Sequence, residues 1–118
     1  MLDIDELERS NVSFYLAHLD GNLVGTAALV DHGAGRVELK RMFVHEAARG
    51  SGVAGSLLRS IESDSAAAGI DEIVLETGTL HKAAQSLYAK HGYREVPLFG
   101  QYVGEQFSVC MAKSITPT

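Results

Sequence analysis

The sequence is poor in cysteine, with Cys110 as the single one among 118 residues. No intramolecular disulfide can form, and we expect a cytoplasmic protein because disulfides are typical of secreted chains. Long hydrophobic runs are absent as well, and none approaches the ~20 residues that span a bilayer. The acidic start at residues 1–6 does not have the pattern of a signal peptide. These absences predict a protein with no membrane segment.

Basic residues are also few, since ten Lys and Arg stand against fifteen Asp and Glu, giving a formal net charge of −5. Nucleic-acid binders usually show a basic face, so we expect no nucleic-acid partner. A cationic substrate such as an amine is compatible with this charge. The five histidines show no metal-ligand spacing, and we expect no metal.

The first part of the sequence predicts mostly strands. Apolar and polar side chains alternate with the period of two that is typical of half-buried strands. Asp20 and Gly21 form a strong signal for a hairpin turn between two of them. We expect the end of a helix at residues 4–8, followed by an antiparallel meander of strands at residues 11–19, 23–30 and 36–45.

After Gly52 the apolar period changes. Leu57 and Ile61 fall at helical spacing, and Gly69 is a good helix stop. A short apolar strand at residues 73–75, a second helix that stops at Gly92, and strands at residues 93–96 and 107–111 are expected to follow. This order predicts one α+β domain over residues 1–118, in which a strand-helix-strand crossover follows the meander.

A glycine-rich turn stands between the last meander strand and the first helix. The N–H groups and partial positive charge of a helix N-terminus can hold a diphosphate, and glycines let the backbone approach it closely. An arginine at the start of the turn adds donors suited to phosphate oxygens. A turn without any ligand remains an equal reading of the pattern alone. The turn consists of Arg49, Gly50, Ser51, Gly52, Val53 and Ala54.

The same glycines also match a different fingerprint. Residues 50–55 read G-x-G-x-x-G, as in dinucleotide-binding proteins, and Glu76 lies near the distance expected for a ribose-binding acid. However, the preceding strand belongs to an antiparallel meander, and the chain has room for one crossover where a dinucleotide fold needs several. A dinucleotide site is therefore the less favoured alternative.

Several separated segments resemble the GNAT superfamily of acetyl-CoA-dependent N-acetyltransferases. Residues 49–54 fit its signature Q/R-x-x-G-x-G/A, and residues 38–45 resemble the strand that leads into that loop. Residues 73–77 resemble the next strand, and residues 87–94 resemble the L-Y-x-K-x-G-F/Y ending of the following helix. The resemblance implies a mixed, mostly antiparallel central sheet flanked by helices. It also implies a shortened N-terminal part that lacks the usual first strand and helix, since only about ten residues precede Asn11.

The resemblance implies acetyl-CoA as co-substrate and assigns residues to it. In the family, a bulged strand pairs with the pantetheine arm, and one strand N–H can polarise the thioester carbonyl. His81 stands where the family usually has an asparagine that contacts the arm, and a histidine can still donate a hydrogen bond. The residues implied for the arm are Met42, Phe43, Val44 and His81, and those implied for the pyrophosphate are Arg49, Gly50, Ser51, Gly52, Val53 and Ala54.

Glu38 and Tyr88 are the candidate catalytic residues. Glu38 lies eleven residues ahead of Arg49, a position that some members use for the general base. Strand parity predicts that it shares a face with Met42 and Val44, and the alternative is a carboxylate that merely pairs with a neighbour such as Lys40. Tyr88 matches the tyrosine that protonates the departing thiolate, and its alternative is a core-edge aromatic.

The implied activity is direct transfer of an acetyl group from acetyl-CoA to a primary amine of a small molecule or peptide. A non-catalytic acyl-CoA sensor or interaction module is the alternative, because the shortened N-terminal part removes elements that commonly form the acceptor wall. A partner chain that completes this wall makes a homodimer plausible. The loop at residues 99–103 resembles a segment that borders the acceptor pocket in some members, so Tyr102 is expected in an ordinary loop, with a contact to the substrate as the alternative. Cys110 is expected as a buried strand residue rather than a nucleophile.

Overall fold

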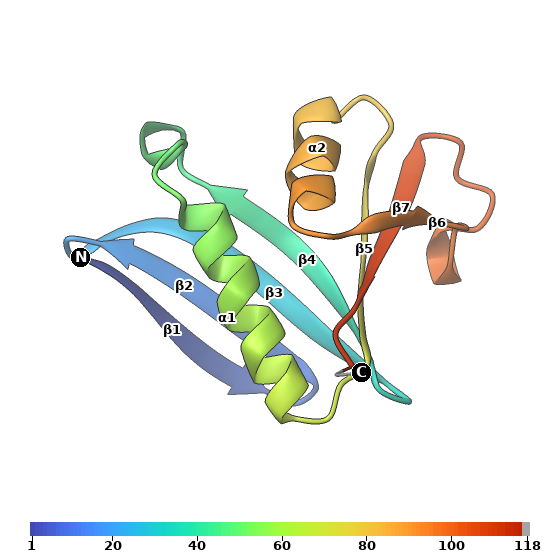
Figure 1. Ribbon diagram of the computed structural model, residues 1–118, viewed down its shortest axis with the longest axis horizontal. Coiled ribbons are helices and arrows are strands. Elements are labelled where there is room, and N and C mark those ends of the chain that lie inside the picture. The colour runs from blue at the N-terminus through green and yellow to red at the C-terminus, as the bar shows by residue number, and fades with distance from the viewer. Residues whose placement is uncertain (117–118) are drawn as a thin grey trace.

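The computed structural model describes residues 1–116 and shows a seven-stranded sheet with two helices against one of its faces (Figure 1). The strands are β1 (Leu2–Arg9), β2 (Val12–Leu19), β3 (Asn22–Gly33), β4 (Arg36–Val44), β5 (Glu72–Gly78), β6 (Arg94–Val96) and β7 (Ser108–Ser114). The helices are α1 (Val53–Ala67) and α2 (Lys82–Lys90), and the 3-10 turns are η1 (Glu46–Ala48) and η2 (Gly100–Tyr102). The strand order is β1-β2-β3-β4-β5-β7-β6.

The pairing of the strands gives a mixed, mostly antiparallel sheet. Among the strands of residues 1–116, only β4 and β5 run parallel, and α1 is the crossover between them. Parallel neighbours need such a crossover, whereas β2, β3 and β4 follow one another through tight turns. The α+β architecture predicted from the sequence is therefore confirmed.

The predicted helix at residues 4–8 is wrong, because these residues belong to β1. This strand pairs with β2 in continuous register from Leu2 opposite Leu19 to Arg9 opposite Val12. Leu2 and Ile4 pack against the core, whereas their acidic neighbours are exposed, which is the period of a strand. A short isolated helix is marginal in water, while the ladder with β2 pairs every backbone group on one edge of β1. A strand thus precedes β2, and the two-residue connection leaves no helix there.

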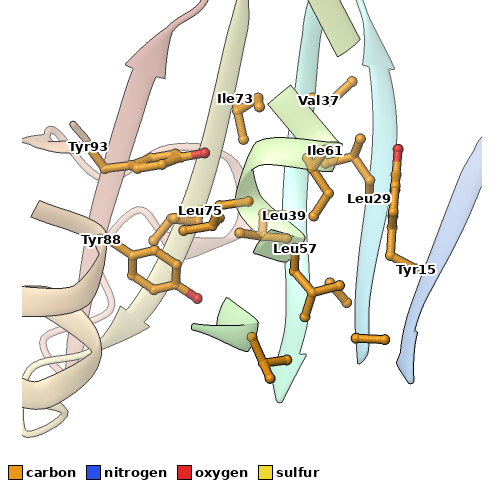
Figure 2. Close-up of a cluster of buried hydrophobic side chains, with 14 of the residues drawn as sticks. Tyr15, Leu29, Val37, Leu39, Leu57, Ile61, Ile73, Leu75, Tyr88 and Tyr93 are labelled. Atoms are coloured by element: carbon orange, nitrogen blue, oxygen red, sulfur yellow. The ribbon is translucent and has the colours of Figure 1, made fainter. Parts of the chain in front are cut away.

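Helix α1 packs directly on the meander. Its apolar face supplies Leu57, Leu58 and Ile61, each 0% exposed. Close approach at the start of the helix depends on Gly25 of β3, where an added Cβ would lie 2.9 Å from Val53 Cγ1. Figure 2 shows this cluster of buried side chains, to which α2 adds Tyr88. The core therefore fixes the N-terminal end of α1, and with it the glycine-rich turn, over the sheet.

A β-bulge interrupts β4 after Lys40. Between the pairs Ala28–Lys40 and Thr26–Phe43, one residue of β3 faces two of β4, and Arg41 adopts a left-handed φ of +54°. Phe43 is consequently turned outward and is 54% exposed. The extra residue reverses the side-chain parity of the second half of the strand.

The prediction that Glu38 shares a face with Met42 and Val44 is therefore wrong. Met42 and Val44 pack against the core on the helix-covered face. Glu38 lies on the opposite face, like Lys40, because its neighbours Val37 and Leu39 belong to the core. The bulge also ends the regular sheet, since β4 pairs with β5 only from Arg36–Glu72 to Leu39–Leu75. Beyond that point the two strands diverge (Figure 1).

Candidate functional site

A groove of about 1070 Å³ lies on the helix-covered face, where β4 and β5 have diverged. Its walls come from the end of β4, the glycine-rich turn with the start of α1, and helix α2. The sequence-predicted residues that line it are Met42, Val44, Arg49, Gly50, Gly52, Val53, Ala54, His81 and Tyr88. Two of the predicted cofactor residues do not line it: the side chain of Phe43 is turned outward by the bulge, and Ser51 lies exposed in the turn.

The glycine-rich turn presents unoccupied backbone donors to this groove. Gly50 and Gly52 have left-handed φ angles of +87° and +77°, which glycine adopts without a Cβ penalty. Gly52 is the N-cap of α1 and supplies no side-chain hydrogen bond, so the first N–H groups of the helix have no side-chain cap. The Arg49 Nε donates to the Val44 carbonyl at 3.3 Å, which ties the turn to the end of β4.

The charges around the groove are all of one sign. Among the described residues, none of the side chains that line the groove is a carboxylate, although the chain as a whole carries −5. The lysines and arginines there make no ion pair with any carboxylate in residues 1–116. Such a groove favours a ligand with several negative charges. Its lysines and arginines are Arg49, Arg59, Lys82 and Lys90.

Sequence reasoning missed Arg59, Lys82 and Lys90 as site residues. Arg59 lies two turns into α1 on the side of the glycine-rich turn, and the lysines lie at the two ends of α2. Their basic character was visible in the sequence. What the sequence did not show is that α1 and α2 meet across one groove, because that depends on the crossover and the packing of both helices on the same sheet face.

The hydroxyl of Tyr88 differs from those of the other three tyrosines in its hydrogen bonding. Tyr15, Tyr93 and Tyr102 donate to the carboxylates of Asp64, Glu62 and Glu38. The Tyr88 hydroxyl has no hydrogen-bond partner among the described residues, and the side chain is 7% exposed beside the groove. Burial raises the pKa of Tyr88 to about 12. The group is therefore a protonated donor with a free O–H at neutral pH.

Glu38 lies in a second, smaller cavity on the opposite face of β4. It is 3% exposed, and both carboxylate oxygens have partners: His32 Nε2 lies 2.8 Å from Oε1, and the Tyr102 hydroxyl donates to Oε2 at 2.8 Å. The suggested pairing with Lys40 is not found. Burial, with a further contribution from Glu38, raises the pKa of Tyr102 to about 12.

Neither partner of Glu38 was identified from the sequence. From the sequence, His32 was assigned no role, and Tyr102 was expected in an ordinary loop with a contact to the substrate as the alternative. In the structure, η2 brings Tyr102 back over β4 from 64 positions away in the chain. The cavity has a volume of about 370 Å³ and is lined by His32, Arg36, Glu38, Lys40, Phe99, Gly100, Gln101 and Tyr102.

The two cavities lie on opposite faces of β4 and approach each other at the divergence from β5. The last paired residue of β4 is Leu39. The next residue, Lys40, lines the Glu38 cavity, and Met42 two positions later lines the groove. A ligand that passes between the separated strands can therefore extend from the groove toward Glu38.

The structure also bears on Cys110, on groups of metal-ligating side chains and on the length of the helices. Cys110 is 0% exposed in β7, as expected of a core residue, and burial raises the pKa of its thiol. Within residues 1–116, no three His, Cys, Asp or Glu side chains gather as a set that could hold a metal ion. Neither helix described here has the length and apolarity required to cross a bilayer.

Comparison with known proteins gives relatives of one kind. IAA acetyltransferase of Azospirillum brasilense is 35% identical over 116 residues, covering 98% of this chain and 76% of that protein. Human N-acetylaspartate synthetase is 31% identical over 118 residues, covering 98% of this chain and 39% of that protein. The chain thus spans about two fifths of the length of the human relative.

Solved structures agree with these relatives. A Klebsiella pneumoniae protein provisionally assigned as an acyl-CoA N-acyltransferase is 29% identical, with a TM-score of 0.86 over 92% of this chain and 76% of that one. A GNAT family acetyltransferase from Elizabethkingia anophelis with acetyl-CoA bound is 18% identical, with a TM-score of 0.78 over 88% of this chain and 76% of that one. The family model of the acetyltransferase (GNAT) domain matches residues 10–95, and the chain belongs to the GNAT acetyltransferase family.

Proposed function

We propose that this chain transfers an acetyl group from acetyl-CoA to a primary amine, directly and within a ternary complex. The observation that carries the proposal is the groove, which joins uncapped helix N–H groups, two left-handed glycines and only basic charged side chains. These are the features that bind a diphosphate. The bound acetyl-CoA in the Elizabethkingia relative supports the same ligand here.

The groove suggests how each part of acetyl-CoA is held. The N–H groups at the start of α1 and the Arg49 guanidinium bind the pyrophosphate, and the other basic residues of the groove offer donors to the remaining phosphate. The pantetheine arm lies along β4 beyond Leu39, where the edge facing β5 has no strand partner. Backbone groups of Met42 and Val44 are available there for the amides of the arm. His81, at the N-cap of α2, lines the groove near this path.

The positions of Glu38 and Tyr88 suit a direct transfer. The amine enters from the Glu38 side, loses a proton to that carboxylate, and attacks the thioester carbonyl between the separated strands. A free N–H of β4 stabilises the oxyanion. The carbon–sulfur bond then breaks, and the Tyr88 hydroxyl gives its proton to the leaving thiolate. The second proton, which the attacking nitrogen loses as the amide forms, returns through water to the Tyr88 phenolate. Base and acid on opposite faces of the sheet keep the entering amine and the departing thiol apart.

His32 completes the proposed proton path. Its ring is hydrogen-bonded to Glu38 and is partly exposed, with 45% of the side chain accessible. A proton accepted by the buried carboxylate can pass along this hydrogen bond to the imidazole and from its exposed side to water. Glu38 is thereby restored for the next cycle.

One observation favours a second candidate, a non-catalytic acyl-CoA-binding module. Both oxygens of Glu38 already have hydrogen-bond partners, which is also how a purely structural carboxylate is held. In that case the groove binds acetyl-CoA but no amine is acetylated. Release of free thiol on mixing with amines distinguishes the two functions.

Several broader expectations stay predictions within this proposal. We propose a single GNAT-like acetyltransferase domain over residues 1–118. The acceptor is a small-molecule or peptide amine, and a second copy of the chain contributes to the acceptor wall in a homodimer. A cytoplasmic location stays a prediction as well.

The proposal is tested by calorimetric titration with acetyl-CoA. The chain should bind it with a micromolar or lower Kd, and Gly52→Ala should weaken binding about tenfold or more, because a Cβ strains the left-handed turn and crowds the phosphates. The matched control is Gly21→Ala, which introduces the same strain at φ +83° in a hairpin away from the groove.

Catalysis is tested separately by thiol release with a panel of amines. Glu38→Gln should reduce turnover about a hundredfold while leaving acetyl-CoA affinity unchanged. Absence of any acetyl-CoA binding would contradict both candidate functions. Tight binding without thiol release would favour the non-catalytic module.

A further inference from the structure

The Glu38 cavity has an unusual charge for a site that receives an amine. Along the outer face of β4, Arg36, Glu38 and Lys40 occupy alternate positions, and His32 faces them from the end of β3. The cavity thus has one carboxylate and two permanent cations, Arg36 and Lys40, although the whole chain carries −5. A positively charged cavity repels an ammonium ion that carries no negative group of its own.

The two permanent cations are only partly neutralised. The Arg36 guanidinium lies 4.9 Å from the centroid of the Phe99 ring, and its Nε is 3.5 Å from Glu72 Oε1 without forming a hydrogen bond. Lys40 has no ion-pair or hydrogen-bond partner within the described part of the chain. Lys40 is also the first residue of β4 beyond its pairing with β5. A free ammonium therefore stands at the point where the acyl group would arrive.

We infer that the acceptor is a zwitterion, an amine that also carries a carboxylate a few bonds away, as in an amino acid. This inference rests on the proposed function. The amine lies at Glu38, and the carboxylate pairs with Lys40 and Arg36. Residues two apart on a strand are separated by about 6.6 Å, so side chains from these positions are near enough to bind the two charged groups of one small molecule. The apolar wall at Phe99 is left to accommodate the rest of the acceptor.

Lys40 is accordingly a specificity-determining residue. Its charge should matter for acceptors that carry a carboxylate and not for those that lack one. If Lys40 had only a structural role, its replacement would change kcat/KM equally for every acceptor. A comparison of acceptors with and without a carboxylate therefore distinguishes a role of Lys40 in substrate recognition from a role in the stability of the fold.

The test compares L-phenylalanine with L-phenylalaninamide and 2-phenylethylamine, each at the same concentration of unprotonated amine. The amino acid should have a kcat/KM at least about tenfold higher than the other two. Lys40→Gln should remove this preference by lowering kcat/KM for the amino acid alone, and Lys40→Arg should restore most of it. Arg94→Gln, which removes the same charge from an exposed position on β6, should change nothing.

A second readout does not require turnover. The product N-acetyl-L-phenylalanine should bind the CoA-loaded chain more tightly than N-acetyl-2-phenylethylamine does, and Lys40→Gln should abolish the difference. Equal kcat/KM values for all three amines, unaffected by Lys40→Gln, would overturn the inference while leaving the proposed function intact. Failure to acetylate any amine would reject the proposed transfer, and the product-binding preference would then decide the inference alone.

Discussion

At the scale of single residues, Tyr88 shows that the residue type alone does not determine what a side chain can do. All four tyrosines of the chain have a raised pKa, and three of them donate to a carboxylate. Tyr88 alone has a hydroxyl without a partner in the described residues, and it faces the groove. Because burial raises the pKa of Tyr88 to about 12, the hydroxyl holds its proton at neutral and mildly alkaline pH.

Replacing Tyr88 by Phe should lower kcat for acetyl transfer about a hundredfold, because the leaving thiolate loses its proton donor. The Kd for acetyl-CoA should stay unchanged, since the ring still fills the core. Stopped-flow measurement of thiol release together with calorimetry checks both values. Since the pKa of Tyr88 is about 12, the wild-type rate should show no loss from its ionisation below about pH 10.

Tyr93→Phe is the matched control for this variant. Tyr93 packs edge-on against Tyr88 with 5.8 Å between ring centroids, but its hydroxyl donates to Glu62 and not toward the groove. The Tyr93→Phe variant should have a changed free energy of unfolding and an unaltered kcat. Equal losses of kcat in both variants would show that Tyr88 acts only through packing.

At the scale of secondary-structure elements, the bulge in β4 decides where the site residues point. Two residues of β4 oppose one of β3, so Met42 and Val44 face the helices while Glu38 faces away. A strand of regular parity would have placed Glu38 on the same face as those residues. The bulge thus places the groove at Met42 and Val44 on one face of β4 and the Glu38 cavity on the other.

Arg41→Gly tests the strain in this bulge. Arg41 has a φ of +54°, which costs a residue with a Cβ about 1 kcal/mol relative to glycine. The variant should keep the bulge and raise the free energy of unfolding by up to about 1 kcal/mol, as measured by urea denaturation. Arg41→Val should lower it, because a β-branched residue tolerates this conformation least. The opposite order would indicate that the arginine side chain, rather than its backbone, stabilises the bulge.

The error at β1 also belongs to this scale. Residues 4–8 were predicted as the end of a helix, whereas they form a strand paired along its whole length with β2. Their side chains allow either state, and the pairing partner decided the outcome. Strand preference depends on the neighbouring strand more than on the segment itself.

At the scale of the whole molecule, buried phenols connect stability to pH. Tyr15, Tyr88 and Tyr93 are 1%, 7% and 3% exposed, and burial is the main cause of the raised pKa of each. An unfolded chain loses these protons near pH ~10, whereas the folded chain keeps them to higher pH. Their contribution to stability is therefore complete below about pH 10 and is lost as the pH rises from there toward the folded-state pKa values.

We expect the free energy of unfolding to fall steeply above pH ~10, by about 1.4 kcal/mol per pH unit for each of these tyrosines. Urea denaturation at several pH values between 9 and about 11.5 measures the slope. Tyr88→Phe should make the fall of the unfolding free energy with pH less steep, by the contribution of one tyrosine. A slope identical to that of the wild type would contradict the raised pKa of Tyr88.

The sequence by itself determined the architecture and the cofactor groove to a large extent. Strand alternation, the change of period after Gly52 and the glycine-rich turn are local signals, and they identified all elements except β1 and the two 3-10 turns. Most residues predicted to bind acetyl-CoA line one groove, because a strand, a turn and a helix that follow each other in the chain also lie together in space. The roles of these residues stay predictions.

Only the tertiary structure decided what surrounds Glu38. Its partners come from the end of β3 and from η2, six and 64 positions away in the chain, and a single extra residue in β4 selected the face on which it lies. The convergence of Arg36, Lys40 and η2 on one cavity likewise arises from sheet order and loop return. Contacts between distant segments depend on packing, and local periodicity carries no information about them.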